Sequence, residues 1–166
     1  MTTAYEPSQV SFDRLDENSC FVDECDRIYA PQQFDWDCGV ACLNMAFRFC
    51  NVSNNWDFAA SSYSLNKTPL WTIDIFILLH ENGLEDAVMY TTYVGVNPTH
   101  FHNSWYTDYL ARDTERVDIG FQKAYQSGWS IQERNFTTDE LILHFVGGGT
   151  AAILLVNGQT LGNHHR

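Results

Sequence analysis

The spacing of apolar residues changes near residue 84, and this change constrains the fold more than any other feature of the chain. Before it, residues 38–50, 55–63 and 72–81 have apolar side chains at helical spacing. After it, residues 87–94 are rich in β-forming side chains, and the continuous apolar run 150–156 predicts a buried central strand. A helical half followed by a strand-rich half predicts an α+β fold in which the helices pack on a sheet.

Further elements fill the second half. Residues 112–127 predict a helix that ends at Gly128, and residues 129–136 predict another strand. Thr137 followed by Glu140 is a capping-box pattern that opens a short helix through Phe145. The Asn157-Gly158 turn predicts a hairpin, yet only eight residues follow it, and most of them are polar. We therefore expect an antiparallel sheet that is incomplete, with an edge through which the chain can associate with itself.

Composition limits the partners that the surface can bind. The chain has 166 residues, with 9 Lys and Arg against 21 Asp and Glu, which gives a net charge of −12. This charge repels phosphate backbones and anionic lipid, so we expect neither nucleic acid nor membrane as a partner. No segment reaches the roughly 18 apolar residues that a membrane span needs, and the N-terminus does not resemble a secretory signal. We expect a cytoplasmic location, with the nucleus as an alternative.

The sequence divides into three parts. Residues 1–27 carry seven acidic and two basic residues with little periodicity, which is typical of a partly mobile leader. Residues 28–157 hold the predicted helices and strands and form one domain. Residues 158–166 form a tail without a clear pattern.

Cys38 is the strongest candidate for a catalytic residue. It lies where the first helical pattern begins, with Asp37 as the expected N-cap. The positive end of the helix dipole favours a thiolate at such a position, which makes the sulfur a nucleophile. Gln32, six residues earlier, can supply a side-chain amide donor to an oxyanion, a contribution of about 3 kcal/mol to the transition state. Gly39 keeps the approach to the thiol open.

The other cysteines and the histidines are weaker candidates. The chain holds an odd number of cysteines and no secretion signal, so we expect free thiols rather than a disulfide framework. The spacings of the cysteine pairs do not match those of zinc sites, and we expect no metal. We expect Cys42 and Cys50 to pack in the core. None of the six histidines is a firm candidate for a catalytic base; they are His80, His100, His102, His144, His164 and His165.

The residues around Cys38 resemble those of known proteins. The order glutamine, acidic residue, then Cys-Gly-x-Ala is similar to papain-like cysteine peptidases of the bacteriocin-processing type. The fuller pattern Gln-x-x-x-Trp-Asp-Cys-Gly-Val-Ala-Cys resembles the guanylyl cyclase domain-containing family. Further segments share that resemblance, which runs from Arg27 to Asn157: Leu70-Trp71-Thr72-Ile73-Asp74, Gly95-Val96-Asn97, Arg116-Val117-Asp118 and residues 151–157.

The resemblance implies a papain-like domain whose full-length form uses Cys38 and Gln32 on a peptide or amide substrate. It also implies a later Gly-His-x-x-Val strand with the catalytic histidine, followed by Asp or Asn before proline. Neither pattern occurs before Arg166, so we expect a C-terminally truncated form that is weak or inactive.

Two alternatives remain open. The family name suggests that GTP is converted to cyclic GMP, which would require Mg²⁺ or Mn²⁺; otherwise we expect no cofactor. The sequence has no phosphate-binding GxxxxGK[ST] motif, and we expect Asp35, Asp37 and Asp74 to be solvated or capping carboxylates rather than metal ligands. The other alternative is a non-catalytic domain that binds a peptide or protein.

Overall fold

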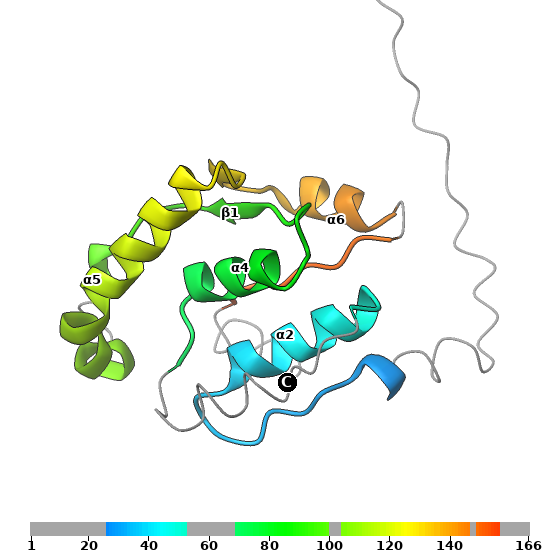
Figure 1. Ribbon diagram of the computed structural model, residues 1–166, viewed down its shortest axis with the longest axis horizontal. Helices are drawn as coiled ribbons and strands as arrows, with labels where there is room; N and C mark the ends of the chain where they lie inside the picture. Colours follow the sequence, from blue (N-terminus) through cyan, green and yellow to red (C-terminus); the bar gives the residue numbers. More distant parts are fainter. Residues whose placement is uncertain (1–25, 53–68, 100–103, 147–148, 157–166) are drawn as a thin grey trace, which may run out of the picture.

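The computed structural model describes residues 26–52, 69–99, 104–146 and 149–156 (Figure 1). The described helices and strands, in chain order, are α2 (Cys38–Phe49), α4 (Thr72–Glu81), β1 (Met89–Thr91), α5 (Ser104–Gln126), β2 (Ile131–Glu133) and α6 (Thr138–Val146). The predicted α+β class is confirmed. The papain-like assignment within that class stays a prediction.

Helix α4 lies between α2 and α5 and contributes to two hydrophobic cores (Figure 1). The first core joins α4 to α5 and β1, and its buried members are Ile73, Phe76, Met89, Val96, Leu110, Val117, Phe121 and Ala124. The second core joins α4 to α2, and its buried members are Val40, Leu43 and Phe47. Ile75, Leu78 and Leu79 of α4 pack against this second core. Because α4 is apolar on both sides, it can be stable only with a partner on each.

Two glycines allow close packing around α4. A Cβ atom added at Gly39, in the first turn of α2, would lie 3.0 Å from the Cβ of Leu70. A Cβ atom added at Gly120 of α5 would lie 3.1 Å from Cγ1 of Ile73. Both separations are shorter than an ordinary van der Waals contact between carbon atoms. The start of α2 and the middle of α5 therefore approach α4 as closely as they do because neither position carries a side chain.

The helices agree with the sequence patterns where the local signal is strong. The expected helices at 38–50 and 72–81 are α2 and α4, and the helix expected at 112–127 is part of α5, which begins earlier, at Ser104. The capping box of α6 is also confirmed: the Thr137 amide donates to Glu140 Oε2 (2.8 Å), and the Glu140 amide donates to Thr137 Oγ1 (3.2 Å). The helix expected at 55–63 lies outside the described residues.

The expected antiparallel sheet is wrong. Strands β1 and β2 pair in parallel, with Met89 opposite Ile131 and Thr91 opposite Glu133. Helix α5 connects the two strands, and a helical connection of this kind is what brings two consecutive strands into parallel pairing. Both strands are also shorter than the patterns at 87–94 and 129–136 predicted, because only three residue pairs form the ladder.

The expected buried strand at 150–156 is also wrong. Residues 150–156 have no regular secondary structure, and Leu154, Leu155 and Val156 are 51%, 75% and 54% exposed. A continuous apolar run shows that a segment can be buried, but burial as a strand needs a neighbouring strand edge to pair with. None of the other described strands pairs with this run.

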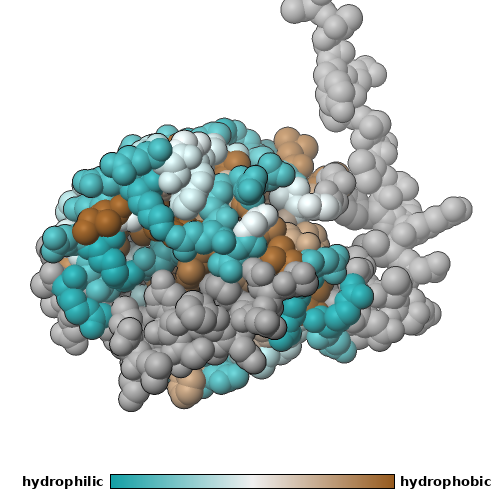
Figure 2. Space-filling view, viewed as in Figure 1, coloured by the Kyte–Doolittle hydropathy of each residue, from teal (hydrophilic) through white to brown (hydrophobic). Residues whose placement is uncertain are grey.

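The described surface is largely hydrophilic on the face seen in Figure 2, and apolar side chains reach the surface near α6. Helix α6 has no buried residue, and Leu143 and Val146 are 72% and 61% exposed. Among the described helices, none is long and apolar enough to span a membrane.

The first core predicts a large difference between two isoleucines. Ile73 is 1% exposed and Ile119 is 56% exposed. Ile73→Ala should lower the free energy of unfolding by about 2–5 kcal/mol, because it leaves a cavity between α4 and α5. Ile119→Ala is the matched control and should change it by less than about 0.5 kcal/mol. Urea denaturation of both variants measures the difference, and equal losses would contradict the packing described.

Candidate functional site

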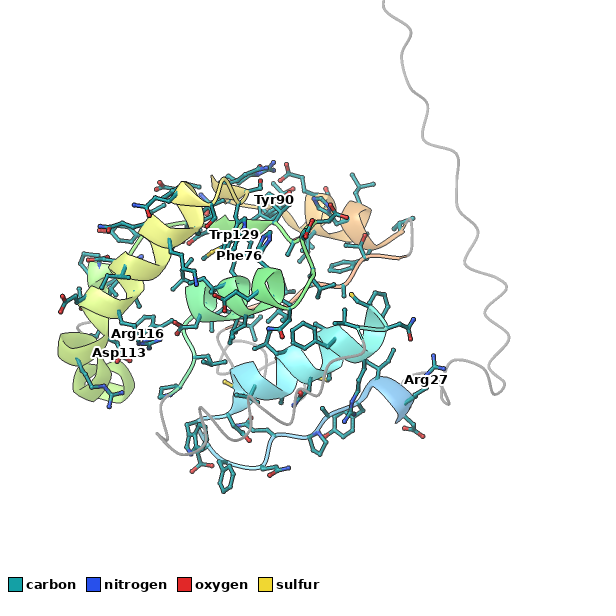
Figure 3. All side chains as sticks on the ribbon, viewed as in Figure 1. Arg27, Phe76, Tyr90, Asp113, Arg116 and Trp129 are labelled. Carbon is teal, nitrogen blue, oxygen red and sulfur yellow. The ribbon has the colours of Figure 1, made fainter. Side chains whose placement is uncertain are left out.

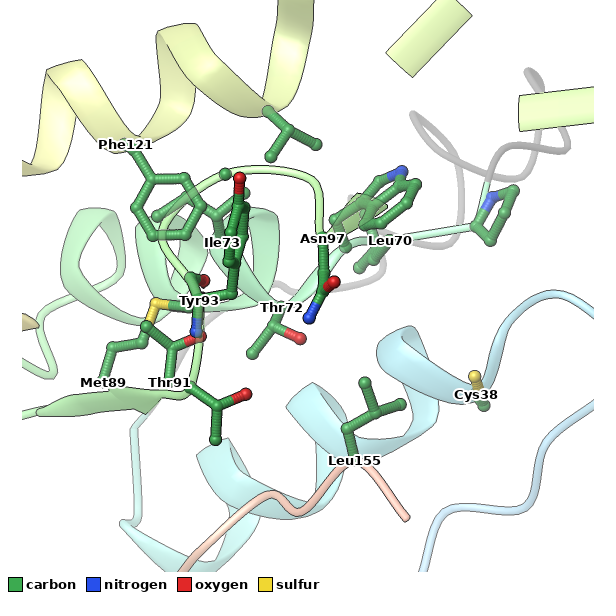
Figure 4. A pocket seen from close by; sticks show the side chains of 15 residues that line it. Cys38, Leu70, Thr72, Ile73, Met89, Thr91, Tyr93, Asn97, Phe121 and Leu155 are labelled. Carbon is green, nitrogen blue, oxygen red and sulfur yellow. Dashed lines mark hydrogen bonds between the residues drawn. The ribbon is translucent and has the colours of Figure 1, made fainter. Parts of the chain in front are cut away.

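Cys38 is the first residue of α2, and its side chain is exposed to solvent. It lies at the edge of a pocket of about 200 Å³ (Figure 4). The packing of Gly39 against Leu70 holds this end of α2 beside the start of α4. The predicted position of Cys38 at a helix N-terminus is thus confirmed, and the fold adds a pocket beside it.

The pocket is formed where several elements meet. Besides Cys38, the described residues that line it are Pro69, Leu70, Trp71, Thr72, Ile73, Met89, Thr91, Thr92, Tyr93, Gly95, Asn97, Val117, Phe121 and Leu155. Ile73, Met89, Val117 and Phe121 are buried members of the first core, so one wall of the pocket is the core itself. The described lining residues include no Asp, Glu, Lys, Arg or His.

The segment before α2 is held by its own hydrogen bonds. Asp37 is the N-cap of α2, as expected, but its carboxylate accepts hydrogen bonds from the amides of Gln33 (3.0 Å) and Phe34 (3.1 Å) rather than from α2. The Gln32 side-chain amide donates to the Phe34 carbonyl. This hydrogen bond stabilises the loop that leads to Cys38. The role of Gln32 as an oxyanion donor stays a prediction.

Three cysteines lie along α2. Cys38 is at its first residue and exposed, Cys42 is half-buried one turn later, and Cys50 is the exposed C-cap. Burial, and after it the nearby Cys38 thiol, raises the pKa of Cys42. Cys42 should therefore be a poor nucleophile at neutral pH. The exposure of Cys50 shows that its expected place in the core is wrong: it is the C-cap, at which α2 ends.

The two described histidines, His80 and His144, both contact aromatic side chains. The His80 ring stacks on Trp129 at 4.4 Å, and its Nε2 lies 3.0 Å from the Ala87 carbonyl oxygen. His144 contacts the rings of Tyr90 and Phe136. Neither histidine lines the pocket beside Cys38. The other four histidines lie outside the described residues.

A buried ionic cluster supports one wall of the pocket, and the sequence patterns did not reveal it. The indole N–H of Trp71 donates to Asp113 Oδ2 (2.9 Å), and Arg116 pairs with both Asp113 and Asp74. Asp74 also accepts a hydrogen bond from the Trp71 backbone amide (2.8 Å). Asp113 and Arg116 lie on α5 (Figure 3). Trp71 precedes α4, so the cluster joins the two elements. Trp71 is thereby fixed as a wall of the pocket.

The pKa values of the two carboxyl groups move in opposite directions. Burial raises the pKa of Asp74, and the neighbouring Arg116 offsets only part of this effect. Burial alone would also raise the pKa of Asp113, but hydrogen bonds from Trp71 and Arg112, together with the charge of Arg116, lower it overall. Asp113 is therefore the carboxylate that the fold stabilises in its charged form.

One sequence signal could have identified this cluster. Asp113 falls on the apolar face of α5, at helical spacing with Leu110, Val117 and Phe121, and it is 2% exposed. A carboxylate on an apolar face requires buried partners, because an unpaired buried charge is very costly. Arg116, three residues later, is the partner that this rule would have suggested.

The described residues do not form a site for Mg²⁺ or Mn²⁺ at this pocket. The Asp37 carboxylate is bound by backbone amides and that of Asp74 by Arg116, while Asp35 lies on the exposed loop. Across the described residues, no group of three or more His, Cys, Asp or Glu side chains is arranged to hold a metal ion.

Comparison with known proteins identifies the family. The sequence pattern of the family described as guanylylate cyclase matches residues 28–165, most of the chain. The chain belongs to this family. It is also 34% identical over 134 residues to guanylyl cyclase 1 of Arabidopsis thaliana, and the alignment covers 80% of this chain. The chain spans about half the length of that relative, 48%. No solved structure matches it.

The ionic cluster predicts how stability depends on pH. Asp113→Asn should lower the free energy of unfolding at pH 7 by about 1–3 kcal/mol, because it removes a charged acceptor from Trp71 and Arg116. Because the pKa of Asp113 is lowered by folding, its contribution is fully present above about pH 4 and is lost as the pH falls further.

The stability difference between the wild type and Asp113→Asn should therefore shrink below about pH 4, as measured by urea denaturation at several pH values. Asp74 is present in both proteins, so its titration affects the free energy of unfolding of both. Asp86→Asn, at an exposed turn, is the control and should match the wild type. A difference that stays constant down to pH 3 would refute the role given to the Asp113 charge.

Proposed function

We propose that Cys38 is the nucleophile of an acyl-transfer site that acts on a peptide or amide substrate. The observation that supports this proposal best is the place of Cys38: an exposed thiol at the first position of α2 and at the edge of an apolar pocket. A catalytic thiol needs access to substrate, a neighbouring positive potential and a cavity that orients the acyl group. The exposure of Cys38, its place at the start of α2 and the adjacent pocket support the proposal on these three counts.

The reaction would proceed in two steps. The Cys38 thiolate attacks the carbonyl carbon, the carbon–nitrogen bond breaks, and the amine leaves with a proton taken from solvent. Water then attacks the thioester, which releases the carboxylic acid and returns the thiol. Backbone amides at the start of α2 are suited to stabilise the oxyanion, because a helix N-terminus leaves its first N–H groups without intrahelical acceptors.

Cys50, at the C-terminal end of α2, is an internal control for the reactivity of the Cys38 thiol. Cys38 and Cys50 are both exposed and lie at opposite ends of the helix, so access to reagent is similar while the helix potential is opposite in sign. At pH 7, iodoacetamide should alkylate Cys38 about 2- to 6-fold faster than Cys50, after allowance for the lower nucleophilicity of a more stable thiolate. Peptide mapping by mass spectrometry measures both rates in one sample.

Equal rates at the two ends of α2 would reject the reactive-thiol proposal. A Cys38→Ser variant provides the second control, because it should leave the alkylation of Cys50 unchanged.

A second candidate function is the conversion of GTP to cyclic GMP. The family description and the name of the Arabidopsis relative favour it. The described lining of the pocket does not, because it includes no Lys, Arg or His, and a triphosphate needs cationic groups or metal ions to balance its charge.

An assay with GTP and Mg²⁺ or Mn²⁺ tests this candidate directly. Cyclic GMP that forms in proportion to the amount of protein, and with release of pyrophosphate, would establish it. Cyclic GMP no higher than in a protein-free blank would remove it. Cys38→Ser is again informative, because loss of the thiol should not prevent a reaction in which the 3′ hydroxyl group of GTP is the nucleophile.

A further inference from the structure

We propose that the pocket beside Cys38 is a specificity pocket for one large apolar side chain, aromatic or branched aliphatic, on the acyl part of the substrate. This inference rests on the proposed function and names the class of substrate that the same site would select.

The size of the pocket supports one side chain rather than a larger ligand. Its volume is about 200 Å³. An engineered apolar cavity of about 150 Å³ is enough to hold benzene, whereas pockets for drug-sized ligands occupy roughly 300–1,000 Å³. A phenyl or isobutyl group therefore matches the pocket in volume.

The walls of the pocket favour an apolar occupant. Met89 and Phe121 are 5% and 6% exposed and belong to the first core, so this wall is held by close packing. Trp71 forms another part of the lining, and its indole N–H is already bound to Asp113. A charged side chain placed here would lose its hydration, and the described lining residues offer it no Asp, Glu, Lys, Arg or His as a partner of opposite charge.

Thr72 and Asn97 contribute polar groups to the lining of the pocket, to which the backbone of a substrate can bind. Figure 4 shows the side chains of Thr72 and Asn97 directed toward the space between α4 and Leu155. The Asn97 Oδ1 atom already accepts hydrogen bonds from the amide (3.0 Å) and hydroxyl (2.8 Å) of Thr99, which fixes the orientation of the Asn97 amide. Its NH₂ group can donate to a substrate carbonyl, as a peptide-binding site requires.

The experiment compares chloromethyl ketones of N-acetyl amino acids that differ only in the side chain next to the ketone: glycine, leucine, phenylalanine and aspartate. In each, the thiolate displaces chloride from the methylene carbon. The phenylalanine and leucine reagents should alkylate Cys38 at least about tenfold faster than the glycine reagent, because they bury apolar area in the pocket. The aspartate reagent should be the slowest. Cys50 of the same molecule reports the intrinsic reactivity of each reagent.

A pocket-filling variant tests whether the selectivity comes from this cavity. Thr92 lines the pocket but is exposed, so Thr92→Trp can obstruct the cavity without disturbing the buried core. It should reduce the preference for phenylalanine over glycine to less than about threefold. Glu85→Trp, at an exposed position that does not line the pocket, is the matched control and should retain the preference.

Failure of this inference can be distinguished from failure of the proposed function. If iodoacetamide reacts faster with Cys38 than with Cys50 but the four ketones show no side-chain preference relative to Cys50, the thiol is reactive and the specificity pocket is refuted. A preference for glycine or aspartate, or a phenylalanine preference that survives in Thr92→Trp, also overturns the inference. If iodoacetamide shows no difference between the two thiols, the proposed function itself fails.

Discussion

The packing of α4 on two sides is the interaction on which the rest of the structure depends. One face of this helix completes the core shared with α5 and β1, and the other completes the core shared with α2. Because one short helix serves both cores, a displacement of α4 would shift the pocket wall at Ile73 and the contact between Leu70 and Gly39 together. The position of Cys38 relative to the pocket is therefore set by helix packing rather than by a loop.

Local signals explain which parts of the fold could be predicted. Helices α2 and α4 and the capping box of α6 follow from residues within a few positions of one another, and these elements form where the patterns placed them. Strand pairing is a relation between distant segments, so the same kind of pattern gave the wrong sheet. Residues 150–156 have the composition of a strand, but composition does not determine whether a neighbouring strand is there to pair with them.

The candidate site could be predicted only in part, for a similar reason. Cys38 was identified because its chemistry depends on its own helix terminus. The environment of Gln32 depends on the turn that precedes α2, and the pocket depends on segments separated by more than 100 residues of sequence, from Cys38 to Leu155. The spacing of apolar residues locates the buried face of α5 but does not reveal the role of Asp113, the charged residue on that face.

The parallel pairing of β1 and β2 has a consequence for how the chain reaches its native state. Met89 and Ile131 are paired although about 40 residues separate them, so the ladder forms only after a long loop has closed. Contacts within a helix join residues that are close in sequence, so forming them costs less chain entropy than forming such distant contacts. We expect α2, α4 and α5 to form first and the ladder to form late in folding, so the part of the pocket at Met89 and Thr91 would be the last to assemble.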